Sequence, residues 1–158
     1  DAEEYVHFTR EMDSAGRMVL LADNCGEIVL DKLLLMTLKE RWPKISYVMM
    51  VRGEPVSNDV TREDALQVGA DQVAEIMDNG TDIAGTAPAH VPEAVREFLS
   101  RTDVILAKGM GNFETAYGYG WPIYYIFLCK CPLFMRRFNK PKYGGMFIHE
   151  SRVEEACH

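Results

Sequence analysis

Along this chain, short runs of apolar residues alternate with longer segments in which apolar positions recur at helical spacing. The runs that we expect to form buried strands lie at residues 18–22, 46–52, 72–77, 103–107 and 145–149. The segments that we expect to form helices lie at residues 28–41, 61–68 and 91–100, and the run at 123–129 suits either element. Thr61 and Asp64 are spaced for a capping box at the start of the second helix. Runs that are apolar throughout are typical of parallel strands covered on both faces. The alternation therefore predicts an α/β fold, with three α/β/α layers around a mostly parallel, Rossmann-like sheet.

Polar side chains follow three of these predicted strands. Asp23 and Asn24 come directly after the first run, Asp59 ends a turn-rich loop after the second, and Lys108 opens a polar loop, residues 108–114, after the fourth. The carboxyl ends of parallel strands meet at one edge of a sheet, where α/β proteins bind ligands. Carboxylate and amide oxygens suit a hard divalent cation, and a lysine nearby suits a phosphate. The sequence thus predicts a phosphate and metal site at this edge.

Each of these residues also has a purely structural interpretation. Asp23 and Asn24 are typical caps before an apolar helix, and Asn58 with Asp59 suits an ordinary turn. Lys108 suits a solvated strand end. We favour the functional interpretation because the residues follow three separate strands that end at the same edge.

Composition and charge exclude several functional classes for this chain. The 158 residues are 47% hydrophobic and 26% charged, as in an ordinary globular protein, and we expect one α/β domain over residues 1–158. The formal net charge of -7 argues against general binding to nucleic acid or to anionic membranes. No apolar window is long enough for a membrane span, and the four cysteines are too irregularly spaced for a disulfide framework. We therefore expect a cytoplasmic protein with free thiols.

Three ordered stretches of the sequence match a family pattern. They are residues 21–28, residues 51–61 followed by Asp64, and residues 107–115. Through them the chain resembles the DUF89 family, the damage-control phosphatases, and it is most similar to the prokaryotic branch. The resemblance implies a metal-dependent enzyme that removes phosphate from small phosphorylated metabolites such as sugar phosphates. Family members carry a helical region before the first motif, so we expect this chain to be the C-terminal catalytic part of a longer architecture.

The resemblance also implies roles for single residues. Asp23, Asn24 and Asp59 correspond to the metal ligands, for a divalent cation such as Mg²⁺, Mn²⁺, Co²⁺ or Ni²⁺. Lys108 corresponds to the lysine that holds the substrate phosphate, and these four are the expected catalytic residues. The residues of the same motifs that we expect to help bind substrate are Glu27, Arg52, Asn58, Asn112 and Glu114.

The leading hypothesis is a metal-dependent hydrolase of small phosphomonoesters. Lys108 and the backbone NH groups of residues 25–27 would stabilise the phosphoryl oxygens. The nucleophile would be a water molecule with an Asp as base, or an Asp side chain. A Rossmann-like nucleotide-binding enzyme is an alternative, although the first loop contains only Gly26 of the expected Gly-x-Gly-x-x-Gly turn. A noncatalytic metabolite- or phosphate-binding module is the other alternative.

Overall fold

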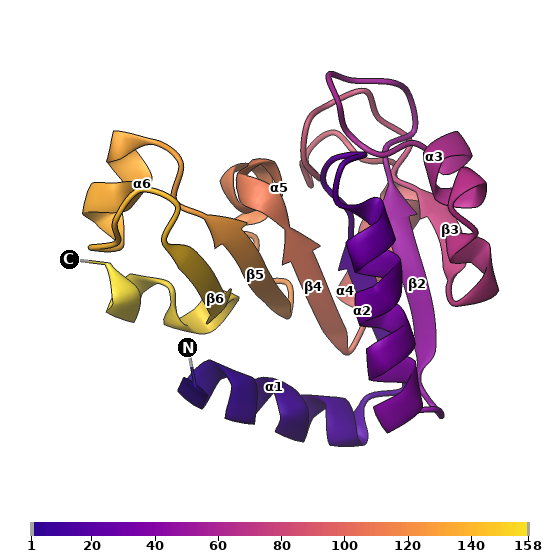
Figure 1. The fold of residues 1–158 in the computed structure, drawn as a ribbon, viewed down its shortest axis with the longest axis horizontal. Coiled ribbons are helices and arrows are strands. Elements are labelled where there is room, and N and C mark those ends of the chain that lie inside the picture. Colours follow the sequence, from indigo (N-terminus) through magenta and orange to yellow (C-terminus); the bar gives the residue numbers. More distant parts are fainter. Residues whose placement is uncertain (1, 158) are drawn as a thin grey trace.

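One mixed sheet runs through the protein. The computed structural model describes residues 2–157, and within them six strands form a sheet in the order β3-β2-β1-β4-β5-β6 (Figure 1). The strands are β1 Arg17–Leu21, β2 Ser46–Val51, β3 Glu75–Asp78, β4 Val104–Lys108, β5 Ile123–Leu128 and β6 Gly145–His149. Neighbouring strands are parallel except β5 and β6, which are antiparallel. The mostly parallel, Rossmann-like sheet is confirmed.

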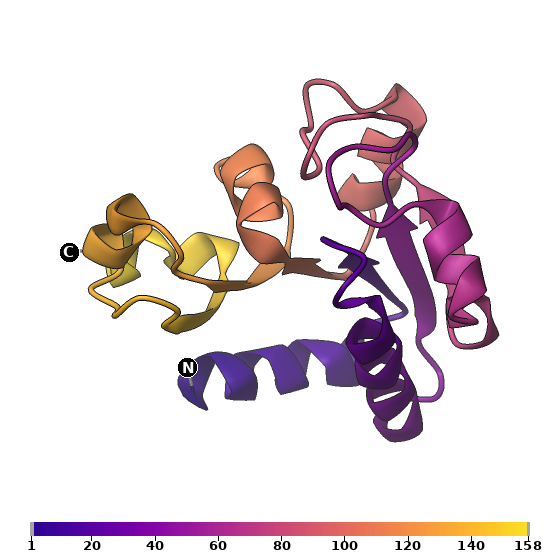
Figure 2. The same cartoon turned by 45° about the horizontal axis from the view of Figure 1, so that its top comes forward.

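Helices cover both faces of this sheet. They are α1 Ala2–Ser14, α2 Ile28–Arg41, α3 Arg62–Gln67, α4 Glu93–Ser100, α5 Gly109–Ala116 and α6 Pro132–Arg137. Buried side chains of α1, α2 and α3 join the core on one face, and those of α4, α5 and α6 join the core on the other. Figure 2 shows the indigo α1 and the orange α5 on opposite sides of the sheet. The three-layer α/β/α arrangement is therefore confirmed.

Strand β1 shows why a run of this kind is apolar at every position. Met18 and Leu20 enter the core on the α2 face, while Val19 and Leu21 enter the core on the α5 face. All four are 0% exposed. Burying a side chain of this size stabilises the fold by about 1.5–3 kcal/mol, so a strand with two covered faces needs apolar residues at every position.

Several predicted elements are confirmed and two are corrected. The run at 123–129 forms strand β5, and α3 begins with the predicted capping box, in which Thr61 and Asp64 bond each other's backbone NH. The third strand was predicted too early, because residues 70–72 form a short 3-10 turn and β3 starts only at Glu75. No helix in the described range is long and apolar enough to cross a membrane.

The second correction concerns residues 109–114, which were predicted as a polar loop but form most of helix α5. Phe113 anchors this helix by packing against the rings of Tyr125 and Phe127 on β5. Gly109 has a φ of 79°, a left-handed conformation that lets the chain turn from β4 into α5 at once. Tertiary packing thus makes a helix from a sequence rich in glycine.

The order of the strands places the ends of β1 and β4 side by side. From β1 the chain proceeds outwards through β2 and β3, and it then returns to β4 on the other side of β1. Such a reversal opens a crevice at the carboxyl ends of the two central strands, where α/β proteins bind ligands. Asp23 follows β1 and Lys108 ends β4, so both lie at this crevice.

Candidate active site

The loop after β1 pairs with the loop after β2. The NH of Val60 donates to the carbonyl of Asp23 at 2.9 Å, and the NH of Cys25 donates to the carbonyl of Asn58 at 2.8 Å. These bonds form an isolated antiparallel bridge between Asn24 and Asp59. The structure therefore brings together the three residues predicted as metal ligands, although the loops that carry them are separate in the sequence.

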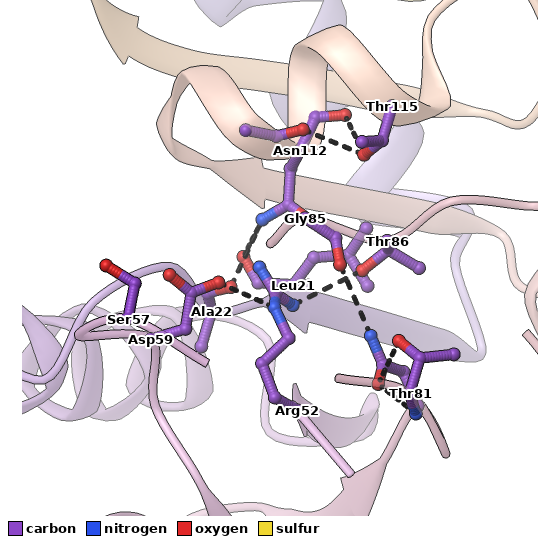
Figure 3. Close-up of polar contacts among 12 residues, drawn as sticks. Leu21, Ala22, Arg52, Ser57, Asp59, Thr81, Gly85, Thr86, Asn112 and Thr115 are labelled. Atoms are coloured by element: carbon purple, nitrogen blue, oxygen red, sulfur yellow. Dashed lines mark hydrogen bonds and ion pairs between the residues drawn. The ribbon is translucent and has the colours of Figure 1, made fainter. Parts of the chain in front are cut away.

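Arg52 holds Asp59 from the protein interior. Its Nε donates to Asp59 Oδ2 at 2.7 Å, and the two side chains are only 1% and 8% exposed (Figure 3). Arg52 Nη1 lies 3.5 Å from Thr86 Oγ1, whereas Nη2 has no hydrogen-bond partner in the described part of the chain. Burial lowers the pKa of Arg52, and the charge of Asp59 opposes that shift. These contacts make Arg52 a residue that positions Asp59, and its expected contact with substrate stays a prediction.

Lys108 is held by two carboxylates of the α2 region, one of which the sequence did not reveal. Its Nζ donates to Glu27 Oε2 at 2.7 Å and to Asp31 Oδ1 at 2.8 Å. Asp31 lies in the first turn of α2, is 1% exposed, and has no partner for Oδ2 among the described residues. We call Lys108, Glu27 and Asp31 the lysine cluster; it fixes the ammonium group at the end of β4.

The pKa shifts in the lysine cluster follow from burial and from the paired charges. Burial alone would lower the pKa of Lys108, but its bonds to Asp31 and Glu27 outweigh burial and raise it. Burial raises the pKa of Asp31 even though Lys108 opposes the shift. For Glu27, burial is outweighed by Lys108, with smaller contributions from Asn24 and Lys130, so its pKa is lowered. Lys108 is therefore fully charged at neutral pH.

Asp23 lies against the start of helix α5. A side chain at Gly109 would overlap the carboxylate of Asp23, so only glycine fits at this position. Burial, with the nearby charges of Asp59 and Glu27, raises the pKa of Asp23. The N-cap residue of α5, Lys108, makes no side-chain bond to the first turn of this helix. The crevice thus places a carboxylate beside an uncapped helix start, where backbone NH groups can face an anion.

Asn112 joins the two central strands and does not face the open crevice. It is 0% exposed, and its Nδ2 donates to the carbonyls of Lys108 at 2.7 Å and Ala22 at 3.1 Å. Figure 3 shows this amide reaching the end of β1 at Leu21 and Ala22. Its Oδ1 has no partner among residues 2–157. These bonds make Asn112 a positioning residue for the strand ends, and its expected contact with substrate stays a prediction.

Asn58 and Glu114 were also predicted to bind substrate, and both of these residues are exposed. Asn58 is exposed, its backbone carbonyl accepts from Cys25, and its side-chain Oδ1 accepts from Ser57. Glu114 is exposed on α5, whereas the adjacent Phe113 is buried against the sheet. Their expected contacts with substrate remain predictions.

The backbone near Asn24 corrects two sequence-based expectations. The NH groups of residues 25–27 were expected to bind phosphate, but they donate to Asn58 O, Asn24 Oδ1 and Asn24 O, respectively. Asp23 and Asn24 do not cap α2 either, because its N-cap is Glu27, whose side chain makes no capping bond. Asn24 instead donates from Nδ2 to Glu27 Oε1 at 2.9 Å. It thus links the predicted metal ligands to the lysine cluster.

A cavity of about 800 Å³ opens beside Lys108. We call it the β5–β6 cavity, since those two strands form much of its wall. Its lining residues are Glu27, Leu30, Lys108, Gly109, Met110, Ile126, Phe127, Leu128, Lys130, Lys140, Pro141, Gly144, Gly145, Met146 and Phe147. Asp23, Asn24 and Asp59 are not among them, so the cavity adjoins the site on its lysine side.

The donor atoms at the crevice fit a hard cation in their chemistry. They are two carboxylates and one amide oxygen, and Asp59 keeps Oδ1 outside its bond to Arg52. Among residues 2–157 no group of three or more His, Cys, Asp or Glu side chains is arranged to hold a metal. Any cation here would therefore rely on the Asn24 amide as a ligand beside Asp23 and Asp59.

Fold and site together define a class of protein. It is a Rossmann-like α/β domain with carboxylates, an amide and a paired lysine at the ends of its two central strands. Residues 2–144 match the family described as damage-control phosphatase ARMT1-like domain. The chain belongs to this family.

Individual relatives agree with this assignment. A damage-control phosphatase of Archaeoglobus fulgidus is 39% identical over 120 residues, which are 75% of this chain and 41% of that protein. A damage-control phosphatase of Pyrococcus horikoshii is 32% identical over 133 residues, covering 84% of this chain and 46% of the relative. The crystal structure of a DUF89 family protein from Pyrococcus horikoshii matches with a TM-score of 0.85 at 27% identity, covering 92% of this chain and 51% of that one. The chain thus spans about half the length of these relatives, or less.

Proposed function

We propose that this chain carries the active site of a divalent-metal-dependent phosphatase that hydrolyses phosphomonoesters of small metabolites. The names of two relatives, both damage-control phosphatases, support the phosphatase class. Support from the structure comes from the convergence of Asp23, Asn24, Asp59 and Lys108 at the switch point of the sheet. The proposal extends to metal dependence and to sugar phosphates as a substrate class.

The balance of charge at the crevice is the observation that carries the metal requirement. Four carboxylates, those of Asp23, Asp59, Glu27 and Asp31, face three cationic side chains, Arg52, Lys108 and the exposed Lys130. A phosphomonoester dianion would enter a region that already has excess negative charge. Such a site needs at least one further cation before it can bind phosphate, and two carboxylates with an amide are suitable oxygen ligands for one.

Different residues of the chain would have different roles in hydrolysis. Asp23, Asn24 and Asp59 would hold the divalent cation, which would supply Lewis-acid polarisation of the phosphoryl group. Lys108, held at a fixed position by Asp31 and Glu27, binds phosphoryl oxygens, and the uncapped start of α5 adds backbone NH donors. A water molecule attacks phosphorus and gives a proton to an Asp carboxylate of the crevice. The ester P–O bond breaks, the proton passes to the leaving oxygen, and the products are the alcohol and inorganic phosphate. Arg52 and Asn112 keep the strand ends in position.

The proposal is tested by measuring phosphate release from a panel of sugar phosphates with Mg²⁺, Mn²⁺, Co²⁺ or Ni²⁺ and with chelator. We expect turnover with metal, loss of turnover in chelator, and loss in Asp23→Ala by at least about a hundredfold. Asp82→Ala, at an exposed loop position outside the site, is the matched control. Undiminished turnover in chelator, or in Asp23→Ala, would contradict the proposal. Tight phosphate binding without turnover would favour a noncatalytic binding module instead.

A further inference from the structure

The β5–β6 cavity is lined by both apolar and charged residues. Binding of the transferred phosphoryl group alone would not need the apolar part of this lining. Its wall is built largely from apolar side chains of β5, β6 and their neighbours, such as Ile126, Phe127 and Phe147. Its volume of about 800 Å³ lies within the range of small-molecule binding sites. Because Lys108 and Glu27 also line it, the cavity opens from the place where we expect the phosphate to bind. A leaving group attached to that phosphate would extend into it.

Lys130 supplies a positive charge to this cavity. It lies two residues after the end of β5, is exposed, and lines the cavity together with Glu27 and Lys108. Lys108 is bonded to two carboxylates, whereas Lys130 has no ion pair with a carboxylate within the described residues. Its charge nevertheless contributes to lowering the pKa of Glu27, so it acts close to the lysine cluster. Lys130 is therefore available to an anion from outside the protein.

The backbone around Lys130 is held in place. The preceding residue, Cys129, is 0% exposed; its NH donates to Gly144 at 2.9 Å, and its carbonyl accepts from Tyr143 at 2.8 Å. These bonds close the segment between β5 and β6 at its base. Lys130 thus projects from a fixed strand end, as Asp23 and Lys108 do.

We propose that the β5–β6 cavity binds the leaving group of the substrate, and that Lys130 binds an anionic group on that leaving group. Among small phosphomonoesters, the substrates that this cavity favours over simple sugar phosphates are then those whose alcohol part combines an apolar body with a carboxylate or a second acidic group. This inference rests on the proposed function, because it places the transferred phosphate at Lys108. It makes Lys130 a specificity-determining residue, whereas the chemistry stays with the residues at the crevice.

A matched pair of substrates isolates the role of Lys130. Phenyl phosphate and 4-carboxyphenyl phosphate differ only in the carboxylate, and kcat/KM is measured for both with metal present. We expect Lys130→Ala to lower kcat/KM about tenfold for 4-carboxyphenyl phosphate and less than about twofold for phenyl phosphate, since a charge-assisted hydrogen bond is lost only in the first case. Lys130→Arg should restore most of the difference. Lys142→Ala, which removes an exposed lysine that stacks on Tyr143 outside the cavity, should leave both values unchanged.

A binding measurement separates failure of this inference from failure of the proposed function. By calorimetry, 4-(phosphonomethyl)benzoate should bind about tenfold more tightly than benzylphosphonate, and Lys130→Ala should abolish the difference. If neither phosphate ester is hydrolysed but this difference is found, the proposed function fails and the role of Lys130 stands. If the esters are hydrolysed and Lys130→Ala affects both equally, or not at all, the role of Lys130 is overturned and the phosphatase stands. Equal affinities of the two phosphonates would also overturn it.

Discussion

Replacing Lys108 by Met tests the lysine cluster, because it removes the ammonium group and keeps most of the side-chain volume. Asp31 would remain with a carboxylate that is 2% exposed and has lost its counter-charge. Removing one partner of a buried ion pair costs about 3–5 kcal/mol. Glu27 is 35% exposed, so solvent screens its charge and it adds little to this cost. We therefore expect the free energy of unfolding at pH 8 to fall by about 3 kcal/mol, the lower end of that range.

The loss should depend on pH in a definite direction. Burial already raises the pKa of Asp31 in the folded protein, and without Lys108 this pKa rises further. A carboxyl group whose folded pKa is raised destabilises the fold above that pKa, and the penalty disappears as pH falls and the group becomes protonated. Lys108 itself stays charged in the wild type over this range, because its pKa is raised. The difference between wild type and Lys108→Met should therefore shrink to less than half of its pH 8 value at pH 5.

Guanidinium unfolding at pH 8 and pH 5, followed by the fluorescence of the buried Trp42 and Trp121, measures both quantities. Lys39→Met is the control, since Lys39 is exposed and its ammonium bonds only the carbonyl of Val73 within residues 2–157. Adding Asp31→Asn to Lys108→Met should recover part of the loss at pH 8. A surface ion pair contributes no more than about 1 kcal/mol. A loss below that value, or a loss of equal size at both pH values, would show that Lys108 and Asp31 do not form a buried ion pair.

Three further substitutions test other parts of the site. Arg52→Met leaves Asp59 buried without its partner and should lower the free energy of unfolding by about 3–5 kcal/mol in denaturant titration, with Arg52→Lys recovering only part. Asn112→Leu removes the bonds that join the ends of β1 and β4 and should cost about 2 kcal/mol in the same titration, whereas Thr115→Val, on the same helix, should cost less. Gly109→Ala should abolish phosphate release by displacing Asp23. Gly118 has a similar positive φ but open space around it, so Gly118→Ala should keep activity at a stability cost of about 1–2 kcal/mol.

The sequence alone predicts the central strands of the sheet and the polar residues that lie at their carboxyl ends. Runs such as residues 18–22 are apolar at every position because both faces of the sheet are covered, and that pattern is local. The crossover rules then place Asp23 and Lys108 at one edge without any knowledge of contacts. The bridge between Asn24 and Asp59 agrees with that expectation.

Tertiary contacts decided what the sequence could not show. Helix α5 begins with three weak helix formers out of four residues, and it is held by Phe113 in a cluster of rings from β5 and α6. In the sequence, Asp31 is a polar position on a predicted helix, where a solvated side chain is expected. Its partner Lys108 lies 77 residues later, so the local sequence cannot reveal the ion pair. The NH groups near Asn24 are satisfied by a loop from another part of the chain, so their availability to phosphate could not be judged locally. An acidic residue in the first turn after a ligand loop is the signal that could have drawn attention to Asp31.

The most direct test is the position of a bound metal and phosphate in a crystal grown with Mn²⁺ and inorganic phosphate. Anomalous scattering locates Mn²⁺ independently of the protein density. We expect one strong anomalous peak within bonding distance of oxygens of Asp23, Asn24 and Asp59, at about 2.0–2.3 Å, with a phosphate between the metal and Lys108 Nζ. A metal bound away from these three residues, or a phosphate bound away from Lys108, would contradict the proposed site.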